Sequence, residues 1–151
     1  RRQRQMCIRD RYYSQGMTLF DALNALFEKY GWYGEKTHNL VMPGLDGAEK
    51  MANLMKLLRE TPPSEIAGVK VATYKDYSDG TARDAASGEV TKIALSGSNV
   101  LRFELCDGTH IVVRPSGTEP KIKVYILTKG ADASERDANL AKYSAWVNTL
   151  A

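Results

Sequence analysis

The sequence has no long apolar segment and almost no cysteine. None of its 151 residues lies in an uninterrupted apolar run of about 18 residues, the length that a membrane-spanning helix requires. The basic N-terminal stretch is not followed by the apolar core of a secretory signal. Cys7 and Cys106 are separated by almost the whole chain, a spacing that fits neither a disulfide framework nor a zinc site. These absences predict a cytoplasmic domain that does not enter a membrane and in which Cys106 is reduced.

The positive charge is confined to one end of the chain. The formal charge is +3 and the isoelectric point is about 8.8, values that raise the question of nucleic-acid binding. Five arginines and one aspartate give the first eleven residues a charge of +4, so residues 12–151 together carry −1. Binding to a nucleic-acid backbone depends on clustered lysine and arginine. The nearly neutral body of the chain therefore argues against a nucleic acid as partner.

The first eleven residues resemble an artefact of sequencing. The stretch Met6–Arg11 can be back-translated as ATG TGT ATA AGA GAC AG, which is one frame of a transposon end used to prepare sequencing libraries. We therefore interpret residues 1–11 as read-through of an adapter and expect the natural chain to begin upstream. The alternative is a disordered basic arm, which the composition also allows. Both interpretations leave this segment out of the predicted fold.

Residues 17–31 have the apolar spacing of an amphipathic helix. Thr18 and Asp21 are typical of an N-terminal cap, and Gly31 suits the left-handed residue that often ends a helix. The apolar stripe of this helix consists of Leu19, Leu23, Leu26, Phe27 and Tyr30.

Two further helices are predicted. One begins at Asp46, with Glu49 as its capping-box partner, and is stopped by Pro62 and Pro63. The other begins near residue 134 and runs to the end of the sequence. Their apolar faces are formed by Met51, Leu54, Met55 and Leu58 in the first and by Leu140, Tyr143, Val147 and Leu150 in the second.

Between these helices, apolar side chains recur about every 2 residues, as in a strand, instead of about every 3.6 residues, as in a helix. The segments 69–77, 100–105, 109–113 and 121–126 alternate and are rich in β-branched or aromatic residues, which predicts strands. Cys106-Asp107-Gly108, between two of these segments, is typical of a hairpin. Residues 32–45, rich in glycine and polar side chains, favour a linker. The predicted fold class is α+β, a mainly antiparallel sheet flanked by helices and preceded by the helix at residues 17–31.

The segment 114–120, RPSGTEP, has the composition of a phosphate-binding turn. Arg114 offers a planar set of donors that meets two phosphate oxygens at once. The hydroxyls of Ser116 and Thr118 add donors, and Gly117 allows the backbone to turn and to approach an anion closely. The alternative is a plain tight connection, because proline, serine and glycine favour turns and an arginine at a strand end is usually solvated.

At these residues the sequence resembles the phosphoglucomutase and phosphomannomutase superfamily, whose last domain carries an RPSGTEP phosphate-binding loop followed by a strand like Lys121–Tyr125. Ser98–Phe103 and Asp107-Gly108 are similar to bacterial members of that family. The resemblance implies a four-domain isomerase that moves a phosphoryl group between the C1 and C6 oxygens of a hexose. It also implies a phosphoserine, Mg²⁺ and glucose 1,6-bisphosphate in the complete enzyme.

The resemblance divides the chain between two domains of such an enzyme. It implies that residues 12–34 are the C-terminal helix of the third domain and that residues 35–151 form the fourth, which in the family has a TATA-binding-protein-like α+β fold. The family's TASHNP-like serine segment, Asp-x-Asp-x-Asp metal loop and Gly-Glu-x-Ser-Gly sugar loop are absent from this sequence. Asp76 and Asp79 do not reproduce the metal spacing. We therefore predict no catalytic and no metal-ligating residue in this chain.

The resemblance assigns four residues to the phosphate of the substrate that does not react, namely Arg114, Ser116, Gly117 and Thr118. Glu119 and Lys123 are supporting candidates. Glu119 is expected to order the loop by accepting backbone N–H bonds, because a carboxylate facing a phosphate would repel it. Lys123 is either a further contact or a solvated strand residue.

The expected function is to bind a sugar phosphate within a phosphoglucomutase that interconverts glucose 1-phosphate and glucose 6-phosphate, with this chain inactive alone. Phosphomannomutase and phosphopentomutase activities remain alternatives, because the loop that recognises the sugar lies outside the sequence. A stand-alone anion- or nucleic-acid-binding module is the alternative of another class. The expected partner is the missing N-terminal part of the same polypeptide, so the apolar face of Leu19, Leu23, Leu26 and Phe27 should be partly exposed.

Overall fold

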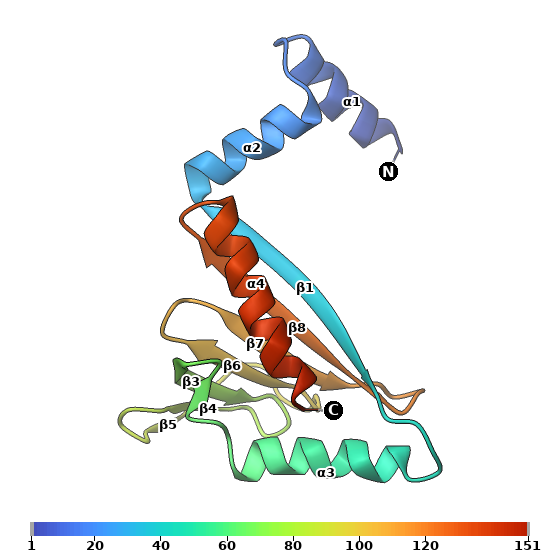
Figure 1. Ribbon diagram of the computed structural model, residues 1–151, viewed down its shortest axis with the longest axis vertical. Helices are drawn as coiled ribbons and strands as arrows, with labels where there is room; N and C mark the ends of the chain where they lie inside the picture. The colour runs from blue at the N-terminus through green and yellow to red at the C-terminus, as the bar shows by residue number, and fades with distance from the viewer. Residues whose placement is uncertain (1, 151) are drawn as a thin grey trace.

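The structure, a computed structural model, describes residues 2–150. Two helices, α1 (Arg2–Tyr13) and α2 (Leu19–Tyr30), project away from the rest of the molecule (Figure 1). The remaining chain forms an antiparallel sheet with two helices, α3 (Gly47–Glu60) and α4 (Ala133–Asn148). None of the helices in residues 2–150 is both long and apolar enough to cross a membrane.

The sheet contains eight strands, and all of its pairs are antiparallel. They are β1 (Trp32–Val41), β2 (Glu65–Ile66), β3 (Val69–Asp76), β4 (Thr81–Asp84), β5 (Val90–Lys92), β6 (Leu101–Leu105), β7 (His110–Pro115) and β8 (Lys121–Gly130). Their order across the sheet is β1-β8-β7-β6-β3-β4-β5, and β2 pairs with β3 outside this path. The predicted α+β class is confirmed, and so is the hairpin at residues 106–108, which joins β6 to β7.

The two helices α3 and α4 pack on the same face of the sheet, and α4 lies along β1 and β8 (Figure 1). Every second side chain of β6, β7 and β8 is buried beneath them, while the alternate side chains are half-buried or exposed. The main members of this core are Met55, Leu58, Leu101, Phe103, Ile111, Val113, Ile122, Val124, Ile126, Tyr143 and Val147. The opposite face, which we call the open face, carries no helix in the described part of the chain (Figure 1).

The ends of α2 follow the sequence prediction closely. Thr18 Oγ1 accepts the Asp21 N–H at 3.1 Å, and the Asp21 carboxylate accepts the Thr18 N–H at 2.8 Å, which completes a capping box. Gly31 has a φ of 104°, a positive value that favours glycine, although its ψ of 161° lies outside the left-handed helical region.

The predicted cap of α3 is wrong in its chemistry. The helix begins after Asp46 as expected, but the Asp46 side chain makes no capping hydrogen bond, and Glu49 therefore has no reciprocal partner. Asp46 instead forms an ion pair with Lys50 at 2.8 Å. The lysine one turn along the helix thus competes with the backbone for this carboxylate.

The prediction of a linker at residues 32–45 is wrong for most of this segment. Trp32–Val41 forms β1, whose ten residues all pair with β8. Residues 32–34, which the sequence grouped with the preceding helix, therefore belong to the sheet. β1 buries only Leu40, so it lacks the apolar alternation of an interior strand. The short strands β2, β4 and β5 were not predicted either, and α1 covers a segment expected to have no structure.

The apolar face of α2 is exposed, as expected. Leu19, Leu23 and Leu26 keep 47%, 45% and 48% of their surface accessible, so none of them is packed against the sheet domain. Phe27 is half-buried because its ring stacks on Trp32, with ring centres 5.0 Å apart. The Arg136 guanidinium of α4 lies 5.8 Å and 5.5 Å from these two rings. This cluster connects α2 to the sheet domain.

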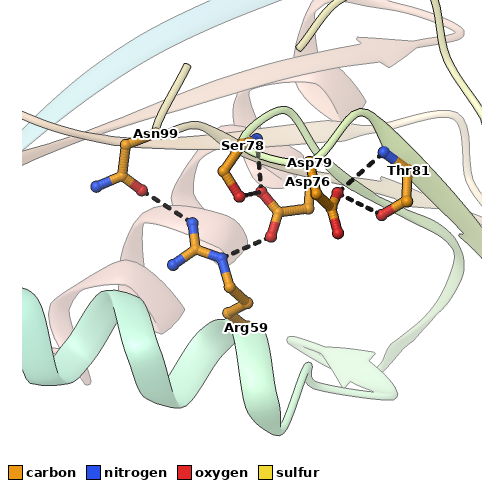
Figure 2. Close-up of polar contacts among 6 residues, drawn as sticks. All are labelled: Arg59, Asp76, Ser78, Asp79, Thr81 and Asn99. Carbon is orange, nitrogen blue, oxygen red and sulfur yellow. Dashed lines mark hydrogen bonds and ion pairs between the residues drawn. The ribbon is translucent and has the colours of Figure 1, made fainter. Parts of the chain in front are cut away.

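A buried carboxylate ties the end of α3 to the sheet, as Figure 2 shows. Asp76 accepts Arg59 Nε at 2.5 Å and the backbone and hydroxyl donors of Ser78 at 2.9 Å and 2.7 Å. Arg59 also donates to Asn99 Oδ1 at 2.9 Å, which adds the segment before β6 to the network. Burial raises the pKa of Asp76, but the hydrogen bonds from Arg59 and Ser78 outweigh it and hold the pKa below the ordinary value.

We expect Asp76→Asn to lower the free energy of unfolding by about 2 to 3 kcal/mol at neutral pH, because it leaves Arg59 without its charged partner. A lowered folded pKa stabilises the protein above the unfolded value, near 3.9, and this stabilisation is lost as the pH falls through the folded value. The wild-type and variant unfolding free energies, measured by chemical denaturation, should therefore converge in acid. Asp79→Asn, an exposed control in the same turn, should cost less than about 1 kcal/mol. Equal losses in the two variants would contradict a role for the buried network.

Candidate phosphate-binding site

The β7–β8 pairing places two cationic side chains opposite each other. Arg114 is the register partner of Lys123, next to the turn that joins the two strands. The neighbouring residues Val113, Ile122 and Val124 are fully buried, so Arg114 and Lys123 project from the open face. Within residues 2–150 neither side chain has a hydrogen-bond or ion-pair partner. Two positive charges therefore lie side by side without an ion pair, although the charge of Lys123 reaches Glu119 and helps to lower its pKa.

The turn between these strands leaves backbone donors free. Ser116 N–H donates to the Lys121 carbonyl at 2.9 Å, and Lys121 N–H donates to the Glu119 carbonyl at 2.7 Å. Thr118 N–H points at Ser116 Oγ from 3.4 Å. In the described chain the N–H groups of Gly117 and Glu119 have no acceptor. Free amides in a tight turn are suited to an anion, which supplies the missing acceptors.

The role expected for Gly117 in shaping the turn is wrong. This glycine does not have a positive φ, so the backbone conformation is open to any residue. A Cβ at this position would meet no atom of the protein within 4 Å. The missing side chain instead leaves open space beside the backbone at this point of the turn.

Glu119 orders the turn by a route that differs from the expected one. Its carboxylate forms an ion pair with Lys121 and accepts no backbone N–H. The hydrogen bond and charge of Lys121 lower the pKa of Glu119. The turn is also fixed at its far side, where the Pro120 carbonyl accepts the Met42 N–H at 2.9 Å.

The turn forms one wall of an open groove of about 430 Å³. Ser116, Gly117, Thr118 and Glu119 line this groove, whereas Arg114 and Lys123 do not. The other wall is the amino end of α3, with Gly44, Leu45, Ala48 and Met51. The structure thus brings the hydroxyl and glycine positions together in this groove, while the two cations next to the turn project from the open face.

The sequence did not indicate that the amino end of α3 approaches the turn. Gly47 allows this approach, because a Cβ there would lie 2.1 Å from the Met42 carbonyl oxygen and 3.1 Å from Pro120 Cβ. The first N–H groups of a helix carry partial positive charge, which favours anions nearby. The predicted helix start at Asp46 indicated where this partial charge lies. The sequence could not show that the turn at residues 116–120 lies next to it.

Residues 49–139, more than half of this chain, match the family model described as "Phosphoglucomutase/phosphomannomutase, C-terminal domain". The chain belongs to this family. The phosphoglucomutase of Staphylococcus aureus strain N315 is 37% identical over 117 residues, covering 78% of this chain and 21% of the relative. That of Staphylococcus epidermidis strain RP62A is 34% identical over 113 residues, covering 75% and 20%. The chain thus spans about a fifth of the length of these curated relatives.

Solved structures add a more distant similarity. The open form of pp63/parafusin, a phosphoglucomutase from Paramecium, aligns with a TM-score of 0.47 and 17% identity over 87% of this chain and 22% of that one. The family assignment rests on the sequence comparisons.

The residues described here do not fit the magnesium ion that the family uses. No group of three histidine, cysteine, aspartate or glutamate side chains in residues 2–150 could hold a metal. The oxygens of Asp76 are occupied by Arg59 and Ser78, and Asp79 accepts the backbone and hydroxyl donors of Thr81 (Figure 2). No metal-dependent step is therefore assigned to this chain.

Gly117→Ala separates ligand binding from folding. We expect its stability to be unchanged or raised by up to about 1 kcal/mol, since φ is compatible with alanine and the methyl group meets open space. The same methyl group would project into the space through which we expect the anion to approach Gly117, so the affinity for inorganic phosphate should fall about tenfold, or ~1.4 kcal/mol. Thermal unfolding and a phosphate titration followed by NMR measure the two effects. Unchanged phosphate affinity would show that the anion binds elsewhere.

Proposed function

We propose that this chain binds the phosphate group of a sugar phosphate through Arg114, Ser116, Gly117 and Thr118, with Lys123 as an additional positive charge. The observation that carries the proposal is the unpartnered pair of Arg114 and Lys123. Like charges directly opposite each other in a sheet are destabilising. A phosphate bound between them would turn this repulsion into attraction, and the arginine fork could hold two of its oxygens.

The turn contributes donors that do not depend on the identity of the sugar. The free amides of Gly117 and Glu119 and the hydroxyls of Ser116 and Thr118 all suit phosphate oxygens. Glu119 supports the turn through Lys121, which also neutralises its charge next to the anion. These groups hold a phosphate in place, and none of them is placed to break a phosphate ester bond.

Arg114→Gln tests the phosphate site. We expect the affinity for inorganic phosphate to fall at least tenfold, because glutamine keeps hydrogen-bonding capacity but loses the charge and the fork. Isothermal titration at low salt measures this change, and the wild-type affinity should itself fall as salt is added. Arg83→Gln, which removes another exposed arginine from β4, should leave the affinity within twofold. Equal effects of the two variants would show that phosphate is attracted non-specifically to the positive charge of the chain and is not bound at this site.

For the complete protein we propose a cytoplasmic phosphoglucomutase that interconverts glucose 1-phosphate and glucose 6-phosphate. The matched curated relatives are phosphoglucomutases, while the family as a whole also includes phosphomannomutases. The phosphoserine and the groups that bind Mg²⁺ and glucose 1,6-bisphosphate would lie outside this chain, in the part of the polypeptide that covers the exposed face of α2. By fixing one phosphate, the site would present the other end of the sugar for reaction.

It follows that this chain alone should show no turnover. We expect no conversion of glucose 1-phosphate in a coupled assay with Mg²⁺ and glucose 1,6-bisphosphate, because the sequence lacks the family's TASHNP-like serine segment and the described residues contain no metal ligand set. The complete gene product should be active, and its relative rates with glucose, mannose and pentose phosphates would identify the sugar. Turnover by the isolated chain would contradict this division of roles.

A further inference from the structure

The edge strand β1 adds a third polar residue to the pair of cations. Asn39 is the register partner of Lys123 on the side away from Arg114. The three residues therefore form a row across the adjacent strands β1, β8 and β7, with Lys123 in the middle. Directly opposite residues have Cβ atoms about 5 Å apart, so the row spans about 10 Å.

The neighbours of Asn39 on β1 show which way its side chain points. Leu40 is buried in the core, and His38 Nε2 lies 2.9 Å from Ser144 Oγ on α4. Both neighbours therefore face the helices, and Asn39, which is exposed, projects from the open face with Lys123 and Arg114. Within the described residues its amide group has no hydrogen-bond partner.

The chemistry of Asn39 differs from that of the other two members of the row. Arginine and lysine side chains only donate hydrogen bonds, which suits phosphate oxygens. A sugar hydroxyl both donates and accepts hydrogen bonds, and an asparagine amide can pair with it in either role. The row thus combines a charged end for an anion with a neutral end for a hydroxyl group.

We propose that Asn39 is a ligand-contacting residue that hydrogen bonds to a hydroxyl group of a sugar whose phosphate is held by Arg114 and Lys123. This inference rests on the proposed phosphate site and extends it from an anion to a phosphorylated polyol. It also gives the edge strand, which the sequence indicated as a linker, a part in recognition of the sugar.

The test compares two ligands on the same 151-residue chain. Inorganic phosphate and glucose 6-phosphate are titrated into the wild type and into Asn39→Val, which suits a strand but removes the amide. We expect the variant to lose about threefold to tenfold in affinity for glucose 6-phosphate, the range of one hydrogen bond, and to bind inorganic phosphate within twofold of the wild type. Thr37→Val, a polar-to-valine control on the same face of β1, should leave both affinities unchanged.

A second measurement does not depend on how the variant folds. In the wild type, the Asn39 side-chain amide signals in NMR spectra should shift with glucose 6-phosphate and stay in place with inorganic phosphate. Shifts of equal size with both ligands, or an Asn39→Val variant that weakens both ligands equally, would overturn the contact to the sugar. If the wild type binds inorganic phosphate but Asn39→Val leaves the affinity for glucose 6-phosphate unchanged, this inference alone is overturned. A wild-type chain that binds neither ligand overturns the phosphate site as well.

Discussion

The pairing of β7 with β8 is the constraint on which the site depends. Val113, Ile122 and Val124 are fully buried beneath the helices, so their burial fixes the register of the two strands. A slip by one residue would turn Arg114 into the apolar core and expose Val113, which would lose about 1.5 to 3 kcal/mol of burial for each such side chain. The hydrophobic core thus determines where the cations and the free amides stand. The turn itself contributes little to that choice.

The same register imposes an electrostatic cost by placing two like charges opposite each other. Arg114 and Lys123 repel each other, and such like-charged pairs destabilise a sheet by up to about 1 kcal/mol. Solvent on the open face reduces the repulsion, and Glu119, which forms its ion pair with Lys121, interacts with Lys123 only over a longer distance. A sheet selected for stability alone would place a carboxylate opposite Arg114. The lysine found at that position instead fits the anionic ligand that we propose.

Local signals predicted much of the fold, and the errors arose where distant parts of the chain meet. The cap of α2 and the β6–β7 hairpin depend on neighbours in sequence, Thr18 with Asp21 and Asp107 with Gly108, and both were predicted. β1 is held by β8, about ninety residues away in the chain, and buries only Leu40, so its sequence carries no clear strand pattern. The motif likewise identified Arg114 and Gly117, but it could not show that Lys123 and Asn39 lie in the same row. That row exists only because two non-local strand pairings are in register.

The arrangement of β1 and β8 also relates the site to the rest of the polypeptide. At one end of this strand pair, Trp32 opposes Gly130 and leads into α2, whereas at the other end Val41 opposes Lys121 beside the turn (Figure 1). The nine steps of extended chain from Trp32 to Val41 separate these ends by about 30 Å. α4 packs along both strands, and Gly31 and the stacked rings of Phe27 and Trp32 join one end of the pair to α2. The aromatic cluster and the proposed phosphate site therefore lie at opposite ends of one continuous pair of strands.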